Sequence, residues 1–363
     1  MQFELRPVIL NLFNRYAAIH PLNHYTGILA MQGLARLGHR TDDDAVLAKA
    51  QQALAPFAAG EVEPFGNFRV YRCGGNGTAY LHRHGLWPEA AALLETCASE
   101  QMDAPRGDDR IYCRPSPKQL PERRIWIDTA FAVCPFMLDC GVAFDRPEWV
   151  DDAVHQILAM YRVFLDPACG LVHQGKNFNG PASISDDHWS RGNGWGLLAL
   201  AEVVERLPEG HPQRAECRRI FAEWLRAALA VRNYEGLWFQ EMAVANPRQT
   251  YTETSGSGLI LYALGIALQT GVLEPQEARL SFEHGLRALL RFVTVDGNVY
   301  HCCTSCCCPG DGSVEAYLKR PPILNDNHAF GPVILALTQA LEHGFDVLEP
   351  LPDSEVQPVA IYR

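Results

Sequence analysis

The fold is indicated by residues 191–207, RGNGWGLLALAEVVERL, in which a polar, glycine-rich loop leads into an apolar helix rich in small residues. The apolar residues of this segment recur at helical rather than alternating spacing. The same transition, from a polar or aromatic loop to a small-residue apolar helix, occurs six times. The six segments are residues 24–38, 74–85, 126–141, 191–207, 253–268 and 325–342. A repeat of this kind predicts a fold built from six similar units.

Amphipathic helices separate these segments, for example in residues 148–164, 213–231 and 275–293. They carry charges on one face and apolar residues on the other, which is typical of an outer layer. Six inner helices that alternate with outer ones predict an all-α fold, the (α/α)6 barrel or six-hairpin toroid. An irregular helical domain is the alternative. Short strands are expected at residues 237–239 and 298–300.

The loops that precede the inner helices should gather at one rim of such a barrel. This arrangement would place seven side chains around a common pocket: His24, Asn76, Asp128, Trp189, Arg191, Glu253 and Asp326. No Gly/Ser-rich or Pro-rich linker divides the chain, so we expect a single domain over residues 1–363.

The composition limits the classes of function. Apolar residues make up 48% of the chain and charged residues 20%, which supports a packed core. The formal net charge of −11 argues against nucleic acid or an acidic membrane surface as a partner, because both need a basic face. The first residues show no basic leader followed by an apolar block, and nowhere do eighteen apolar residues run together. We therefore expect a cytoplasmic protein with no nucleic-acid or membrane partner; the oligomeric state is left open.

The cysteines are unevenly distributed. Seven of the twelve are scattered singly, and five fall in residues 302–308, CCTSCCC. Without an export signal, we expect reduced thiols. Cys303 and Cys306 have the C-x-x-C spacing of a zinc or redox motif. A structural zinc needs four ligands, however, and no second pair follows at a usual spacing, so we interpret the cluster as a buried loop and predict no metal site.

Asp128 is the leading candidate for acid–base chemistry. It is preceded by three apolar residues, 125–127, and followed closely by two more at positions 130 and 131. Desolvation by such neighbours raises the pKa of a carboxyl and suits it to proton transfer near neutral pH. The alternative is a capping acid that accepts hydrogen bonds from the free amides of a helix start. The residues alone leave both interpretations open.

Residues 186–195, DDHWSRGNGW, predict a ligand-binding loop rather than a structural corner. Trp189 and Trp195 could offer flat faces on which a sugar ring stacks. Arg191 could offer a planar fork that matches a carboxylate. Gly192 and Gly194 let the backbone turn sharply and approach a ligand.

Four further polar residues are ambiguous. His173, in GLVHQG, is on its own more typical of a hydrogen-bonded loop histidine than of a catalytic group. Glu253 heads an inner helix and resembles a cap. Asp326 and His328, in NDNH, share this ambiguity between capping and substrate contact.

Taken together, five motifs resemble glycoside hydrolase family 105. These are the unsaturated rhamnogalacturonyl hydrolases, close relatives of the unsaturated glucuronyl hydrolases of family 88. The likeness spans roughly residues 20 to 340. The motifs occur in the family's order: WIDT (126–129), GLVHQG (170–175), HWSRGNGW (188–195), ETSGSG (253–258) and RPPILNDNHAFGP (320–332).

The resemblance implies a barrel that removes a 4,5-unsaturated galacturonic acid from the non-reducing end of pectin fragments, where the next sugar is rhamnose. The implied chemistry is hydration of the C4–C5 double bond of a small oligosaccharide, without a metal or organic cofactor. Asp128 matches the family's general acid/base. The positions that match its substrate-binding residues are Tyr25, Trp126, His173, Trp189, Arg191 and Trp195.

One departure from the family concerns a second aspartate before the second inner helix. Here residues 70–77 read VYRCGGNG and contain no carboxylate. Either Asn76 or a neighbour substitutes as a hydrogen-bonding partner, or the substrate or activity is altered. The missing carboxylate leaves one alternative open, a sugar-binding or regulatory homologue without turnover. The cysteine cluster leaves a second one open, a zinc-dependent toroid cyclase of the lanthionine-synthetase type that uses the cluster with His301 or His328.

Overall fold

The structure is a computed structural model that describes residues 2–64, 68–107, 109–115, 123–308 and 310–352. Within these residues, six helices form a closed inner ring in which each contacts the next and the last returns to the first. They are α2 (Tyr25–Arg40), α4 (Gly75–Arg83), α6 (Thr129–Ala143), α8 (Ser190–Arg206), α10 (Thr254–Thr270) and α13 (Asn327–Glu342). Each begins at or within a few residues of a segment predicted from the repeat.

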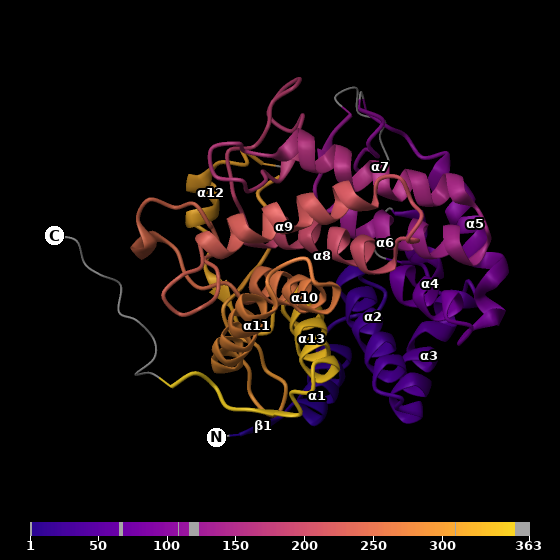
Figure 1. The fold of residues 1–363 in the computed structure, drawn as a ribbon, viewed down its shortest axis with the longest axis horizontal. Coiled ribbons are helices and arrows are strands. Elements are labelled where there is room, and N and C mark those ends of the chain that lie inside the picture. Colours follow the sequence, from indigo (N-terminus) through magenta and orange to yellow (C-terminus); the bar gives the residue numbers. More distant parts are fainter. Residues whose placement is uncertain (1, 65–67, 108, 116–122, 309, 353–363) are drawn as a thin grey trace.

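An outer layer of helices packs against this ring. It consists of α1 (Leu5–Ile19), α3 (Asp44–Ala58), α5 (Ala91–Met102), α7 (Pro147–Phe164), α9 (Arg214–Ala230) and α11 (Pro275–Leu289). In Figure 1 the chain runs round the ring from indigo α1 through magenta α7 to yellow α13, which lies beside α1 and α2. The predicted (α/α)6 barrel is confirmed.

Small residues allow the helices to approach closely. A methyl group on Gly196 of α8 would lie only 2.1 Å from the ring of Trp224 in α9. One on Gly258 of α10 would lie 2.8 Å from the backbone of Pro332 in α13. Both distances are shorter than any van der Waals contact, so a larger residue at either position would separate the helices.

The remaining elements are short. They are η1 (Arg69–Cys73), η2 (Pro88–Ala90), η3 (Pro247–Gln249), η4 (Leu290–Phe292), α12 (Val314–Leu318), β1 (Phe3–Glu4), β2 (Ile125–Trp126), β3 (Gly175–Lys176), β4 (Cys302–Cys303), β5 (Pro322–Ile323) and β6 (Val347–Leu348). The strands pair antiparallel as β1–β6, β2–β3 and β4–β5. The strands expected at 237–239 and 298–300 form only isolated bridges, Phe239 with Thr252 and Val293 with Val299.

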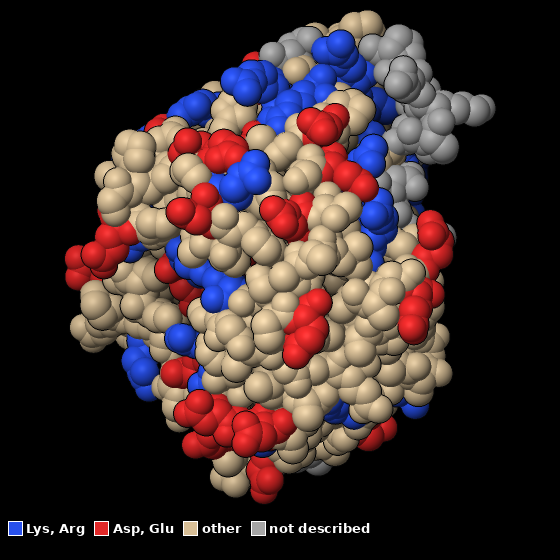
Figure 2. Space-filling model, turned by 90° about the vertical axis from the view of Figure 1, so that its right-hand side faces the viewer, with Lys and Arg blue, Asp and Glu red and all other residues tan. Residues whose placement is uncertain are grey.

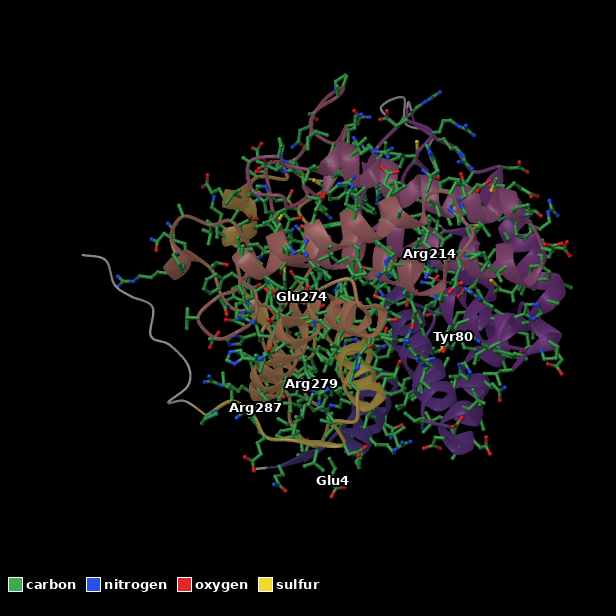
Figure 3. All side chains as sticks on the ribbon, viewed as in Figure 1. Glu4, Tyr80, Arg214, Glu274, Arg279 and Arg287 are labelled. Atoms are coloured by element: carbon green, nitrogen blue, oxygen red, sulfur yellow. The ribbon has the colours of Figure 1, made fainter. Side chains whose placement is uncertain are left out.

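The C-terminal segment, residues 345–349, contacts both the first strand and helix α11. Beyond its pairing with β1, the segment contacts two arginines of α11, labelled in Figure 3. The guanidinium of Arg279 lies 4.7 Å from the centre of the Phe345 ring, and Arg287 Nε donates to the Glu349 carbonyl at 3.2 Å. The ring is therefore closed by contacts on its outside as well as by α13.

Charges are mixed on the molecular surface seen in Figure 2, where acidic and basic side chains alternate and basic ones gather toward the upper end. Among the described residues, none of the helices is long and apolar enough to span a bilayer.

The two ends of the ring differ in character. We call the end at which the inner helices begin the N-terminal end, and the other the C-terminal end. Arg36, near the end of α2, makes ion pairs with Glu205 of α8 and Glu342 of α13. Arg206 pairs with Asp139 and Glu202 there too. The C-terminal end is thus joined by a buried network of opposite charges.

Candidate active site

Asp128 precedes the first residue of α6, but its side chain makes no capping hydrogen bond to the described residues. Its Oδ2 instead accepts a hydrogen bond from Gln174 Nε2 at 3.4 Å, and the residue is half-buried. The capping interpretation is therefore wrong. Burial raises the pKa of Asp128 to about 6, against the opposing effects of the Gln174 hydrogen bond and the Arg191 charge. At that pKa the carboxyl can both give and take a proton near neutral pH.

Gln174 fixes this carboxyl in place, and the sequence analysis did not single it out. Its side chain is fully buried, and its Oε1 accepts a hydrogen bond from the Tyr317 hydroxyl at 2.6 Å. Its backbone carbonyl accepts from Ile127 N at 2.9 Å, beside the β2–β3 pair. The amide nitrogen of Gln174 is therefore aimed at Asp128 by two partners. The signal was a polar residue inside the short GLVHQG motif.

His173 lies next to Gln174 but faces another partner. Its Nδ1 lies 3.0 Å from the backbone carbonyl of Asp187, and its ring lies 4.7 Å from that of His188. This geometry matches the hydrogen-bonded loop histidine that the sequence allowed.

Trp126 is half-buried on the strand that leads to Asp128. Its ring is stacked with that of Phe178, with centroids 5.5 Å apart and planes at 9°. The guanidinium of Arg114 lies 4.3 Å from the Trp126 ring centre. The Trp126 ring is thus packed against Phe178 and Arg114, two residues before Asp128 in the chain.

Arg191 is a buried cation with unused donors. Only 1% of the residue is exposed, and its Nη1 donates to Ser255 Oγ at 3.0 Å and to the Cys303 carbonyl at 2.6 Å. Its Nε and Nη2 are buried and have no hydrogen-bond partner in the described part of the chain. A buried guanidinium left in this state is costly, and an anionic ligand would satisfy it.

The expectation that Trp189 and Trp195 offer open faces for sugar stacking is wrong. Trp189 is 1% exposed; its ring packs against the Arg191 guanidinium at 4.4 Å and lies 5.4 Å from the ring of Tyr317. Trp195 is 2% exposed and stacks on Phe131 of α6 at 4.7 Å. Both tryptophans flank the first turn of α8, which packs against its neighbours in the ring, so their faces contact protein.

Tyr25, His328 and Asp326 form a hydrogen-bonded chain. The Tyr25 hydroxyl lies 2.5 Å from His328 Nε2, and His328 Nδ1 lies 2.6 Å from Asp326 Oδ1. An ionised carboxylate only accepts, so Nδ1 carries the proton and Nε2 accepts from Tyr25. Burial, followed by the Arg191 charge, lowers the pKa of His328 to about 4, so the ring is neutral at pH 7. Burial also raises the pKa of Tyr25. The charges of Arg191, Asp128 and Asp326 act on this hydroxyl as well, so the four groups lie at the same, N-terminal end of the ring.

Glu253 is the helix cap that the sequence suggested. Its carboxylate accepts hydrogen bonds from Ser255 N, Gly256 N and Cys303 N at 3.1, 2.6 and 3.0 Å. It also accepts from the hydroxyls of Ser255 and Ser190. The carboxylate is saturated by the protein.

Asn76 does not substitute for the missing carboxylate as a partner of Asp128. Its Nδ2 donates to the Phe131 carbonyl at 3.0 Å and to Gln32 Oε1 at 3.4 Å, so it links α4 to its two neighbours. A different carboxylate lies near Asp128. Asp187, from the loop before α8, is fully buried, and its negative charge is a minor contributor to the raised pKa of Asp128, after burial.

The cysteine cluster lines the same region. All twelve cysteines lie in the described residues and are free thiols. Cys306 is half-buried, and burial followed by the charge of Asp128 raises the pKa of its thiol to about 11. Cys303 Sγ accepts from Gln240 Nε2 at 3.3 Å. The cluster therefore contributes neutral, polarisable groups next to the candidate acid.

The family model of Glycosyl Hydrolase Family 88 matches residues 11–343. Protein Atu3128 of Agrobacterium fabrum is 27% identical over an alignment of 237 positions, which covers 57% of this chain and 97% of that protein. The unsaturated rhamnogalacturonyl hydrolase YesR of Bacillus subtilis is 26% identical over 174 residues, and the match spans only 48% of each. A family 105 glycoside hydrolase of C. acetobutylicum superposes with a TM-score of 0.80 at 22% identity, over 92% of this chain and 98% of that structure.

Proposed function

The chain belongs to glycosyl hydrolase family 88 and is a glycoside hydrolase, and from this premise we propose that it releases 4,5-unsaturated galacturonic acid from unsaturated rhamnogalacturonan oligosaccharides. The observation that carries the proposal is the pairing of two groups at the N-terminal end. One is the half-buried carboxyl of Asp128, with a pKa of about 6. The other is the buried guanidinium of Arg191, with two donors free in the described part of the chain.

Asp128 acts on a double bond rather than directly on the glycosidic bond. An unsaturated uronide is an enol ether, so its C4 is electron-rich. The Asp128 proton is transferred to C4, which leaves an oxocarbenium-like cation at C5 and the ring oxygen. The hydroxyl of a water molecule adds at C5 while its proton returns to the carboxylate. The resulting hemiketal opens and expels the aglycone, and one carboxyl has served as acid and then as base.

Arg191 binds the carboxylate of the unsaturated sugar. Its free Nε and Nη2 lie on one edge of the planar guanidinium, and this edge pairs with two carboxylate oxygens at once. Trp189 is a positioning residue, because its ring supports the guanidinium at 4.4 Å. Burial of the pair excludes water and strengthens the attraction for the anionic sugar.

Tyr25 and Trp126 bind the rest of the sugar. The Tyr25 hydroxyl is oriented by His328 and offers an oxygen that accepts from a sugar hydroxyl. Trp126 provides apolar surface beside Asp128. His173 acts through the Asp187 backbone, and Trp195 through Phe131, so both are positioning residues. Asp187 provides the second carboxylate that residues 70–77 lack.

The test follows the ultraviolet absorbance of the conjugated double bond in unsaturated rhamnogalacturonan disaccharide. Wild type, Asp128→Asn and the matched control Asp151→Asn, an exposed aspartate on α7, are compared. We expect loss of absorbance in wild type and Asp151→Asn, and a rate lower by about 10² to 10⁴ in Asp128→Asn. An unchanged rate in Asp128→Asn would remove this residue from the chemistry.

A sugar-binding homologue without turnover is the second candidate, favoured only by the missing carboxylate in residues 70–77. It predicts that the disaccharide binds in calorimetry, that absorbance does not fall, and that Asp128→Asn leaves the affinity unchanged. Turnover by wild type would exclude it.

A further inference from the structure

Three side chains bring an oxygen, a sulfur and a nitrogen together next to the candidate active site. Asp166 and Cys169 lie in the turn after α7, and His188 lies just before α8. His188 Nε2 is 3.0 Å from Asp166 Oδ2 and 3.5 Å from Cys169 Sγ, and the sulfur is 3.6 Å from the same carboxylate oxygen. Among the described residues, this is the only group of three or more His, Cys, Asp and Glu side chains arranged to hold a metal ion.

The spacing fits a tetrahedral ion. Zinc bonds of about 2.3 Å to sulfur and about 2.0 to 2.2 Å to nitrogen and oxygen place ligand atoms about 3.4 to 3.6 Å apart at tetrahedral angles. Two of the three distances here, 3.5 and 3.6 Å, already have these values. The third, at 3.0 Å, is a hydrogen bond that would open by a few tenths of an ångström.

The surrounding residues orient the three atoms. Asp166 Oδ1 accepts from Ala168 N at 2.9 Å, which leaves Oδ2 to face the histidine. His188 N donates to both oxygens of Glu241, at 2.8 and 3.1 Å, and Glu241 Oε1 lies 3.8 Å from His188 Nδ1. The two backbone hydrogen bonds fix the main chain of His188, and the 3.8 Å separation leaves its Nδ1 without a hydrogen bond to Glu241.

We propose that Asp166, Cys169 and His188 bind one divalent zinc ion, with a fourth position open to solvent. A thiolate, an imidazole and a carboxylate form a borderline-soft set that selects zinc over magnesium or calcium. A quarter of the Asp166 side chain is exposed, so a water molecule can complete the coordination. The site is distinct from residues 302–308, which carry the C-x-x-C spacing.

The position of this site gives the ion a role. His188 lies three residues before Arg191 and directly follows Asp187, whose backbone carbonyl lies 3.0 Å from His173 Nδ1. An ion bound here joins the turn after α7 to the start of α8. It would brace the segment that presents Arg191 and Asp187, whatever sugar the enzyme cleaves.

The test uses the full chain stripped of metal with a chelator and titrated with cobalt(II) chloride. We expect one Co²⁺ per chain, tetrahedral d–d bands, a thiolate-to-cobalt charge-transfer band in the near ultraviolet, and displacement of the cobalt by one equivalent of Zn²⁺. Cys169→Ser should abolish the charge-transfer band and weaken binding more than about 100-fold, because a ligand matters more than its supporting shell. Cys306→Ser is the matched control: it removes another half-buried thiol and should change neither quantity.

Asp166→Asn keeps the shape of the turn and should weaken binding at least about tenfold. It carries the test if Cys169→Ser does not fold, as judged by circular dichroism without metal. The proposal is overturned if wild type shows no charge-transfer band, if the band persists in Cys169→Ser, or if it is lost in Cys306→Ser.

Discussion

Two buried arginines at opposite ends of the ring carry the same charge in opposite circumstances. Arg36 is 2% exposed, and all five of its N–H groups point to acceptors on Glu205, Glu342 and Tyr262. Arg191 is 1% exposed, yet its Nε and Nη2 have no acceptor in the described part of the chain. Equal burial therefore goes with complete pairing at one end and incomplete pairing at the other.

The difference distinguishes an arginine that stabilises the fold from one that has donors available for a ligand. At the C-terminal end, Glu202 accepts from Gln32 at 2.6 Å and Tyr262 at 2.7 Å, and the network leaves little for a ligand to add. At the N-terminal end, no group in the described residues accepts a hydrogen bond from the free edge of Arg191. An unpaired buried charge costs several kcal/mol, and one ion pair with a ligand offsets about that much. We therefore attribute the free edge of Arg191 to the binding of a ligand.

The largest effect should come from breaking the saturated end. Arg36→Met leaves Glu205 buried without its ion-pair partner and Glu342 paired with Arg40 alone, and should lower the free energy of unfolding by about 3 to 5 kcal/mol. Arg191→Met removes an incompletely paired charge and should cost less than about 1 kcal/mol. Urea unfolding of the two variants checks this, and a larger loss of stability in Arg191→Met would reverse the comparison.

The order of the two variants should be reversed when their activity toward the substrate is compared. Arg191→Met should lower kcat/KM for the unsaturated disaccharide about 100-fold, mostly through KM, because a buried charged contact of this kind is worth about 3 kcal/mol. Arg191→Lys should recover only part of this loss, since an ammonium lacks the planar edge. Folded Arg36→Met should keep the wild-type KM; equal losses in both variants would mean that Arg191 is structural.

The ring itself was predictable because its six inner helices repeat one local pattern, and Gly196 and Gly258 show why small residues recur in them. The burial of the Asp128 carboxyl was predictable from its apolar neighbours in the sequence. The burial of Trp189 was not, because an aromatic residue at a helix start can face a ligand or the core, and here Tyr317, far along the chain, decides.

Contacts between distant residues were also beyond the sequence. Tyr25 and His328 are 303 residues apart, and only closure of the ring by α13 brings them together. Cys169 was one of seven scattered thiols, and its neighbour His188 comes from the start of another helix. The sequence drew attention to the denser cluster at 302–308, although the better geometry for a metal lies elsewhere.

The pH dependence should report the partial burial of Asp128. In the proposed mechanism the protonated form of Asp128 donates to C4, so kcat/KM should fall about tenfold per pH unit above about 6. The raised pKa also means that the folded state loses stability as the pH rises through about 6. Gln174→Ala removes a hydrogen bond that lowers the pKa of Asp128. The alkaline limb of the pH profile, where kcat/KM falls, should therefore move to higher pH. Gln51→Ala, on outer helix α3, is the control and should leave the limb in place; a shift to lower pH in Gln174→Ala would contradict the assignment.

The smallest effect should come from the chain of hydrogen bonds that orients Tyr25. Asp326→Asn keeps an oxygen to cap α13 but removes the charge that holds His328 in one tautomer. We expect Asp326→Asn and Tyr25→Phe each to lower kcat/KM about fivefold, or about 1 kcal/mol, and the double variant to lose no more than Tyr25→Phe alone. Once the hydroxyl is gone, its orientation no longer matters, so the effects should not add. Additive losses would mean that Asp326 acts on the substrate by itself, and that the N-terminal end holds two independent polar contacts instead of one aligned chain.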